Sequence, residues 1–541
     1  MCILAGLLTM LSPGAFAQQA AVTPSELSAL KRQLADQQKQ IEQLRLILED
    51  QQKLLERTLA ASSPSPSPAL ETFSLPNAAK LGEVASASPI LPPEPLSPAN
   101  LSPQKDGASD NVAPLFFKIG SARFSPLGFI DVTSVFRTTN TGGGIGTGFG
   151  GIPYGSGPAA NTTENRFSLQ NSRVGLRVDS NVLGGAVTGY LETDFLGNAP
   201  TNLLVTSNSN TLRLRLFWFD WRKDKFEFLG GQTWSLLTPN RKGVSPMPSD
   251  IFYSLDMDTN YQAGLVWSRA PEFRFVYHAN DHVVAAIALE NPEQYVGGAV
   301  TFPSTLPSTV GGQFSTGGSN ANGPNLTPDV IAKLAFDGDA NGKNEHIEIG
   351  GVYRSFQSYN SLTGKKSLAA GGGGEINGNF ELSKGFNLVA NTFAGTGVGR
   401  YIFGLAPDVV VKPNGDISTV NTASAIGGFE WSRKPRDNPK NLETMFYGYY
   451  GGLYIENNYY TDPKNKFEGY GFPGSANGAN RAIQEATFGV IQTFWKNPIY
   501  ADLKLITQYS YLTRNPWSVA IGAPSNAATH MVFVDLRYDL P

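Results

Sequence analysis

The chain has 541 residues, of which 41% are hydrophobic and 16% are charged, and its formal net charge is -3. This length exceeds that of one ordinary domain, so several regions are expected. The near-neutral charge implies no bulk attraction to nucleic acid, and the absence of any run of about eighteen apolar residues after the N-terminus excludes a helical membrane protein.

The first seventeen residues have the pattern of a secretory signal peptide. Met1–Leu11 is apolar, a Pro-Gly pair interrupts it, and an Ala-Phe-Ala run ending at Ala17 supplies the small-x-small cleavage pattern. A short buried helix is the alternative. The single cysteine, Cys2, would leave with residues 1–17, so the mature chain would have no thiol chemistry and no cysteine metal ligand.

Residues 18–60 have a hydrophobic period of seven. A lone helix with so narrow an apolar seam would leave the seam in water, so partner helices are expected, and glutamines at two core positions suit a trimer. A solitary amphipathic helix is the alternative. The segment is therefore predicted to be an oligomerising coiled coil. Its seam residues are Leu27, Leu30, Leu34, Ile41, Leu44, Leu48 and Leu55.

Residues 61–114 are rich in proline and serine, beginning with the Ser-Pro repeat Ser63–Pro68. Frequent prolines forbid both helix and sheet, and few large apolar side chains are available for a core. We expect a disordered spacer between the coiled coil and the last region.

Residues 115–541 alternate apolar and polar side chains in segments separated by short and long connections in turn. Long gaps mostly follow the odd segments and short gaps the even ones, which is typical of an even-stranded antiparallel outer-membrane barrel. The fold class predicted is an all-β transmembrane barrel of about sixteen strands preceded by an α-helical coiled coil. The expected strands are 128–139, 165–180, 186–197, 210–222, 225–236, 260–279, 282–290, 327–337, 345–359, 375–383, 385–404, 421–434, 442–461, 481–496, 501–519 and 528–540.

Charged residues fall on one face of several of these strands. In 210–222, for example, Leu212, Leu214, Leu216 and Trp218 form one face, and two arginines lie on the other. A charge facing lipid costs about 2–4 kcal/mol at the bilayer midplane, so the charged faces are predicted to line a wet lumen. Structural ion pairs in the wall are the alternative. The residues predicted to line the pore and to set selectivity are Arg173, Arg177, Glu192, Asp194, Arg213, Arg215 and Arg274.

The third long connection, residues 237–259, is predicted to fold inwards and narrow the channel, as the third loop of general porins does. An outward-facing loop is the alternative. Its charged residues are Arg241, Lys242, Asp250, Asp256 and Asp258.

One metal-binding pattern and no catalytic constellation can be found. Asp337, Asp339, Asn341 and Glu348 fit the spacing of a calcium loop, although a polar turn between strands explains them equally well. No metal site or cofactor is therefore assigned, and an enzyme is not expected.

Five short motifs occur in this order along the chain: Asn171–Gly175, Glu192–Phe195, Leu212–Arg215, Gly231–Trp234 and Arg269–Arg274. Taken together they resemble those of the DcaP-like outer-membrane porins, which are themselves similar to phosphate-selective porins. The resemblance covers the whole chain and implies a sixteen-stranded trimer that passes small anionic solutes, such as dicarboxylates, through an arginine-lined constriction. The chain departs from the family at its C-terminus, where Asp539-Leu540-Pro541 replaces the aromatic residue of the insertion signal.

These features together predict a homotrimeric porin of the bacterial outer membrane, with its N-terminal region in the periplasm. Its expected partners are the lipid bilayer, small anionic solutes and the barrel-assembly machinery, with no nucleic acid. A structural envelope tether, in which the coiled coil and linker matter more than a channel, is the alternative function.

Overall fold

The computed structural model describes residues 116–155, 157–198, 208–246, 252–255, 262–316, 325–434, 442–497 and 501–540. Within these ranges no helix is long and apolar enough to cross a membrane. The predicted signal peptide, coiled coil and linker lie outside the described residues. So do Leu27, Leu30, Leu34, Ile41, Leu44, Leu48, Leu55, Asp250, Asp256 and Asp258.

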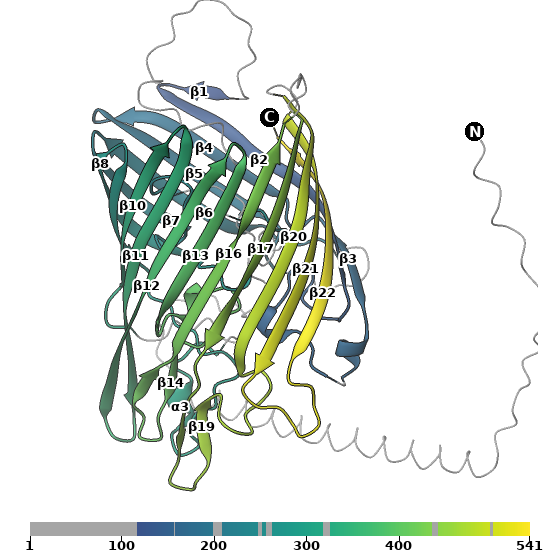
Figure 1. Cartoon of the computed structure of the whole chain (residues 1–541). Helices are drawn as coiled ribbons and strands as arrows, with labels where there is room; N and C mark the ends of the chain where they lie inside the picture. Colours follow the sequence, from purple (N-terminus) through teal and green to yellow (C-terminus); the bar gives the residue numbers. More distant parts are fainter. Residues whose placement is uncertain are drawn as a thin grey trace, which may run out of the picture. The chain divides into compact units, whose positions relative to one another are not determined.

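The described chain forms one closed antiparallel barrel with sixteen strand positions, as the alternation predicted (Figure 1). Each strand pairs with its neighbour in the sequence. The strands of the wall are β2 (Ala122–Arg137), β4 (Arg173–Val182), β5 (Gly185–Asp194), β6 (Arg213–Lys223), β7 (Phe226–Trp234), β8 (Arg269–Asn280), β9 (Val283–Glu290), β10 (Asp329–Ala340), β11 (Lys343–Asn360), β12 (Lys365–Ser383), β13 (Phe386–Thr396), β16 (Asn421–Arg433), β17 (Glu443–Ile455), β20 (Asn480–Asn497), β21 (Ala501–Pro516) and β22 (Ala527–Asp539).

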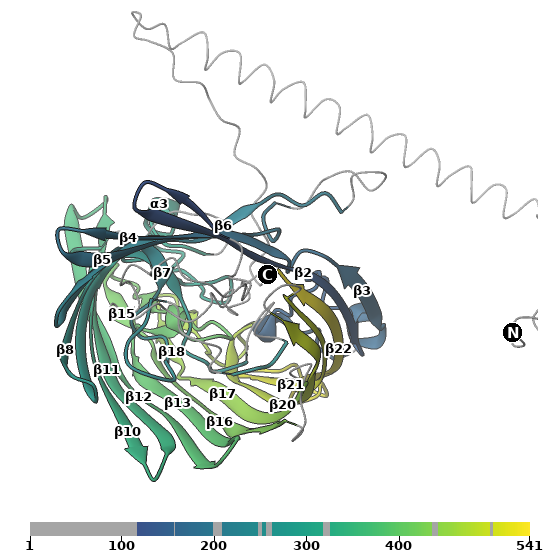
Figure 2. The same ribbon diagram turned by 90° about the horizontal axis from the view of Figure 1, so that it is seen from above.

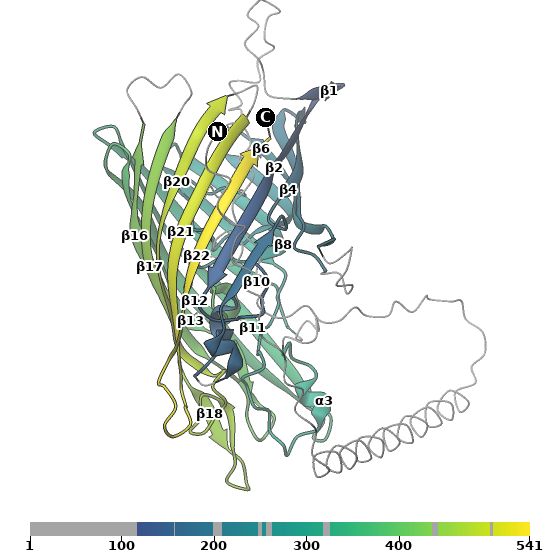
Figure 3. The same cartoon turned by 90° about the vertical axis from the view of Figure 1, so that its right-hand side faces the viewer.

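The barrel closes where the first wall strand meets the last one. β2 pairs with β22 from Phe129↔Asp539 to Arg137↔Met531, and Figure 3 shows the two strands side by side. Two short strands complete this seam. β3 (Glu164–Ser168) continues the position of β4 along one edge of β2, and β1 (Phe117–Ile119) pairs with the start of β2 beyond β22. Closure leaves no open sheet edge. A protein that spans lipid with strands must be closed in this way, because lipid cannot pair with free backbone groups.

The outer face of the barrel is apolar and the inner face is polar. On β22, Val532, Val534 and Leu536 are 44%, 41% and 44% exposed, whereas the alternating Asp535 and Arg537 are 0% and 7% exposed. Other strands follow the same pattern, with exposed outer phenylalanines such as Phe217 and Phe273. In water this surface would be unfavourable, so it indicates a barrel that is solvated by lipid.

The connections between strands differ in length at the two ends of the barrel. Seven short connections lie at the end where the C-terminus is found, and the long ones lie at the other end, where β14, α3 and β19 are labelled in Figure 1. We call the connections at the long-loop end L1 to L8. The fifth, residues 361–364, is short because β11 and β12 themselves extend to 18 and 19 residues. Five connections matter below, namely L1 (138–163), L3 (235–268), L4 (291–328), L6 (397–420) and L7 (456–479).

Small elements occur within these loops. L4 carries the helix α3 (Ser308–Gly311), and L1 carries two 3-10 turns, Phe149–Gly151 and Pro158–Asn161. A further 3-10 turn in L6 spans Gly399–Tyr401. The remaining elements are two hairpins: L6 holds β14 (Val409–Val411) with β15 (Ile417–Thr419), and L7 holds β18 (Asn458–Thr461) with β19 (Phe467–Tyr470).

Three predicted strands were too long. The first of the corresponding wall strands begins only at Arg269 and the second ends at Thr396. The residues outside them contain glycines with left-handed backbone, Gly264 at φ 89°, Gly397 at φ 68° and Gly404 at φ 111°. Residues 262–268 and 397–404 therefore belong to loops, where they pair with each other through the bridge Val266↔Ile402. The third strand ends at Ile455, and the chain then forms β18 away from the wall.

The predicted face of β6 was wrong beyond Leu214. Leu212 and Leu214 are 59% and 46% exposed on the outside, but Leu216 and Trp218 are 0% and 4% exposed. The cause is a β-bulge: Glu192 pairs with Leu216, and the next residue of β5 pairs with Leu214, so Arg215 is skipped. The extra residue reverses the alternation and places Trp218 inside, stacked at 5.4 Å on Tyr190.

Candidate functional site

L3 lies against the inner wall of the barrel, and chain from the loops crosses the ring of strands when the barrel is viewed along its axis (Figure 2). After β7, the described parts of L3 contact wall strands from β9 to β21. Gly264 passes so close to the wall that a Cβ there would lie 2.3 Å from the carbonyl oxygen of Gly452 on β17. The left-handed backbone and this approach both require glycine.

Side chains of seven wall strands accept hydrogen bonds from backbone amides of L3. Carboxylates accept four of them: Leu236 N donates to Glu290 on β9 at 2.8 Å, Gly243 N to Asp337 at 3.0 Å, Asn240 N to Glu348 at 3.2 Å and Ala263 N to Glu485 at 2.9 Å. A loop buried inside a barrel must satisfy its backbone donors, and the wall supplies the acceptors. Uncharged acceptors complete the set: Tyr449 for Tyr253 N, Asn391 for Val266 N and Gln508 for Leu255 N.

Arg241 adds an ion pair to this attachment. Its guanidinium lies 2.6 Å from Glu430 on β16 and 4.7 Å from the ring centre of Tyr253. Burial alone would lower the pKa of Arg241, but Glu430 raises it above the ordinary value, so the guanidinium stays charged. The neighbouring Lys242 is exposed, and no described residue is hydrogen-bonded to it or paired with it. L3 therefore offers one neutralised and one open positive charge.

Five of the predicted pore-wall residues come together on β4, β5 and β6, in a group we call the arginine cluster. Arg215 is central, 2.5 Å from Glu192 and 2.8 Å from Asp194. Arg213 also reaches Asp194, at 2.7 Å, and Arg173 lies 3.6 Å from Glu192. The side chains of Arg173 and Arg215 are 0% exposed and that of Arg213 is 24% exposed. Of these three arginines, Arg213 is therefore the one whose side chain meets solvent.

A fourth arginine joins this cluster without an acid of its own. Arg269, at the start of β8, lies 5.1 Å from the ring centre of Trp234, and Arg215 lies 5.9 Å from the same ring. Among the described residues no carboxylate is within ion-pair distance of Arg269. Four guanidiniums therefore face two carboxylates, which leaves excess positive charge on the inner wall.

The other two predicted wall arginines lie apart from the cluster. Arg177 pairs with Asp179 on its own strand at 2.8 Å. Arg274 pairs with Glu272 at 2.7 Å and also donates to Trp234 O at 2.6 Å and to Ser245 O at 3.3 Å. Arg274 thus holds both ends of the first part of L3.

The calcium pattern forms a hairpin turn instead. Asn341 and Gly342 have φ of 57° and 73°, the geometry of a two-residue Asn-Gly turn between β10 and β11. Asp337 bonds to L3 and to His346 at 2.8 Å, and Glu348 pairs with Lys333 at 3.1 Å. Within the described ranges no three His, Cys, Asp or Glu side chains are placed to hold a metal ion.

A second buried network fixes L4 and L6 to the wall. Arg354 on β11 lies 3.0 Å from Asp329 and 2.9 Å from Asp408 of L6. Arg400 of L6 reaches the same Asp329 at 3.2 Å and Glu293 of L4 at 3.3 Å. The loops at this end are therefore held by charge pairs, and those of Asp329 and Asp408, which are buried, are costly to break singly.

The sequence analysis missed Arg269 and all the wall acceptors of L3. A signal was present for Glu430 and Glu485, each of which is the only acid in its strand and lies on an inward-facing position. Such an acid must find a buried partner. The partner cannot be read from alternation, because it lies up to 222 residues away in L3.

This closed barrel, apolar outside and charged inside with one loop fixed along its inner wall, has the architecture of an outer-membrane channel. No family model matches the sequence, and no curated protein matches it.

Among solved structures, the outer membrane channel DcaP of Acinetobacter baumannii is similar, with a TM-score of 0.55, 17% identity, and coverage of 79% of this chain and 100% of that chain. More distant are the anion-selective porin from Comamonas acidovorans (TM-score 0.43, 10% identity, 77% and 99% covered) and Pseudomonas putida OprB (0.44, 11%, 77% and 94%). The resemblance expected from the motifs is confirmed at the level of the fold.

Proposed function

We propose that the protein is an outer-membrane porin that lets small hydrophilic solutes, preferentially anions, diffuse passively. The observation that carries this proposal is the excess of guanidinium over carboxylate in the arginine cluster, with Arg269 lacking an acidic partner. Fixed positive charge between low-dielectric walls raises the local concentration of anions. The open Lys242 on L3 acts in the same direction.

The selective charges in this proposal are Arg269, which has no acidic partner among the described residues, and Arg213, whose side chain is 24% exposed. Arg215 is neutralised by Glu192 and Asp194, so its field at a distance is weak. Arg269 and the partly exposed Arg213 project the field that a passing solute meets. The wall residues Arg177 and Arg274 are each paired with a nearby acid. In this proposal they stabilise the wall and contribute little to ion selectivity.

Reversal potentials in a salt gradient across a planar bilayer test this proposal. The wild type should conduct and prefer anions, and Arg269→Gln should lower the anion-to-cation permeability ratio roughly two- to five-fold, the effect of about 0.4–1 kcal/mol of local potential. Arg433→Gln is the matched control, because Arg433 is exposed at the short-turn end of β16. Absence of conductance would contradict the porin and favour the envelope tether; an unchanged ratio in Arg269→Gln would contradict the assigned charge.

The proposed assembly is a homotrimer, supported by the heptad seam of residues 18–60. Deleting residues 18–60 should weaken the trimer without abolishing conductance, because the barrel satisfies its own backbone hydrogen bonds. Sedimentation velocity in detergent together with bilayer recording measures both effects. A deletion variant that fails to form the barrel would show that the segment does more than assist assembly.

A further inference from the structure

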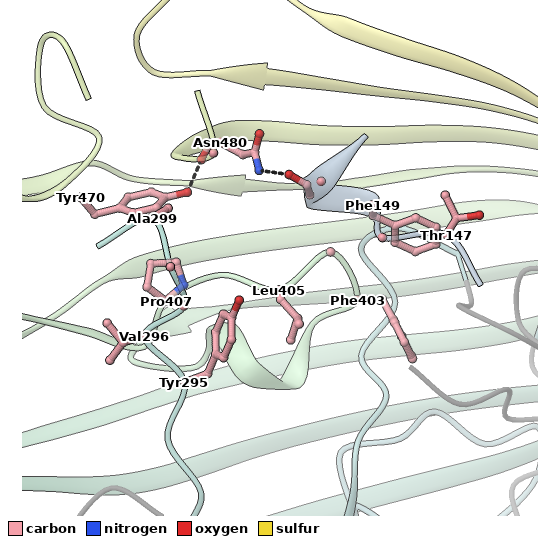
Figure 4. Close-up of a pocket in the computed structure, with 17 residues that line it drawn as sticks. Thr147, Phe149, Tyr295, Val296, Ala299, Phe403, Leu405, Pro407, Tyr470 and Asn480 are labelled. Atoms are coloured by element: carbon pink, nitrogen blue, oxygen red, sulfur yellow. Dashed lines mark hydrogen bonds between the residues drawn. The ribbon is translucent and has the colours of Figure 1, made fainter. Parts of the chain in front are cut away.

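A cavity of about 260 Å³ lies at the long-loop end of the barrel, between L1, L4, L6 and L7. Figure 4 shows Tyr470 and Asn480 on one side of it and Tyr295, Leu405 and Phe403 on the other. Its volume is slightly below the roughly 300–1,000 Å³ of sites for drug-sized ligands, so it suits a single ring. The arginine cluster and L3 take no part in its lining.

The 17 residues that line the cavity are all uncharged. Four of them are aromatic, and seven are glycines that present backbone in place of side chains. An ion entering this site would lose hydration with no opposite charge to compensate it. The lining therefore disfavours the anions proposed for the lumen.

Some polar groups of the lining lack partners. Among the described residues, nothing bonds to the Tyr295 hydroxyl or to the backbone groups of Gly298 and Gly404. Burial, with a smaller contribution from Asp408, raises the pKa of Tyr295 to about 12, so its hydroxyl remains a donor. By contrast, the Tyr470 hydroxyl donates to Asn480 O at 2.6 Å, and Asn480 Nδ2 donates to Gly150 O at 2.9 Å. The two bonds fix one side of the cavity and leave the other side to a ligand.

The glycines keep the cavity open. A Cβ added at Gly151 or Gly298 would meet no atom within 4 Å, and neither glycine has a left-handed backbone. Larger side chains at these two exposed lining positions are therefore compatible with the fold and would narrow the cavity at its open side.

We propose that this cavity binds one small uncharged ring that carries hydroxyl groups, namely a monosaccharide in its pyranose form. The C–H faces of such a ring pack on the aromatic side chains, and its hydroxyls pair with the Tyr295 hydroxyl and the free backbone groups. A purely apolar ring would cover the largely buried Tyr295 hydroxyl without pairing it, which is unfavourable. Binding at this site does not depend on whether the barrel conducts.

Saturation-transfer difference NMR on the full-length protein in detergent tests the proposal, with methyl α-D-glucopyranoside as the probe. Saturation should reach the ring C–H protons in the wild type. Gly298→Leu should reduce this signal at least five-fold by obstructing the open side of the cavity, and Tyr295→Phe should weaken affinity about two- to ten-fold through the lost hydrogen bond. Tyr359→Phe is the matched control, because Tyr359 is 47% exposed on β11 and does not line the cavity.

Two comparison ligands test the chemical preference of the cavity, one a ring with a negative charge and the other a ring with a single hydroxyl. Sodium glucuronate and cyclohexanol should give signals several-fold weaker than the glucoside. The proposal is overturned if the glucoside gives no signal, if its signal persists in Gly298→Leu while circular dichroism shows a native barrel, or if cyclohexanol binds equally well. Gly298→Ala, which adds only a methyl group, should retain part of the signal and keeps the series interpretable if the leucine variant fails to fold.

Discussion

Replacing Glu430 by alanine is expected to free the middle of L3 from the wall and to lower single-channel conductance. Glu430 is 2% exposed in its side chain and is the acid nearest Arg241, which is 15% exposed. Removing it leaves a largely buried guanidinium without its partner, a change that costs about 3–5 kcal/mol. Arg241 would leave the wall to regain water, and the loop would move with it into the lumen, with open-channel current noise as the first sign.

The measurement combines bilayer recording with thermal unfolding followed by circular dichroism. Glu345→Ala is the matched control, because Glu345 is exposed on β11 away from L3. The double variant Arg241→Met with Glu430→Met removes both charges and keeps apolar volume, so its stability should return towards that of the wild type. If Glu430→Ala left conductance, noise and stability unchanged, the remaining anchors of L3 would suffice without the ion pair.

The wall strands could be predicted from the sequence because lipid outside and charge inside impose alternation along every strand. That constraint acts within each strand. The outward position of Val532, Val534 and Leu536 on the last strand can therefore be predicted from that strand alone. It fails where a single residue is inserted. The bulge at Arg215 reverses the face of Leu216, and nothing in the spacing of β6 alone reveals it, because the cause is the register with β5.

The loops could not be predicted in the same way, because their positions depend on contacts between distant segments. Residues 262–267 look like the start of a strand, yet Gly264 bends the chain so that it pairs with L6. The arginine positions were foreseeable from parity, but their pairing was not. Arg269 sits in a motif that the sequence analysis used only for resemblance, and its lack of an acid is visible only once β4 to β8 are placed side by side.

Two single variants of the arginine cluster should differ in what they change: Arg215→Ala mainly stability, and Arg213→Ala mainly ion selectivity. Arg215→Ala leaves Glu192 and Asp194, whose side chains are 0% and 1% exposed, without the arginine that bridges them. We expect a loss of about 3–5 kcal/mol in the free energy of unfolding, as for other broken buried pairs. Arg213→Ala removes a side chain that is 24% exposed, so it should cost about 1 kcal/mol or less.

For ion selectivity we expect the opposite ranking, with a larger effect in Arg213→Ala than in Arg215→Ala. Arg213 faces the solute and its removal lets the field of Asp194 reach the lumen, so Arg213→Ala should shift the reversal potential towards cations and weaken its dependence on ionic strength. Denaturant unfolding and reversal potentials, measured on the same detergent preparations, provide the two readouts. A larger potential shift in Arg215→Ala with a native barrel, or equal losses of stability in both variants, would mean that the buried ion pairs rather than the exposed guanidinium determine which ions pass.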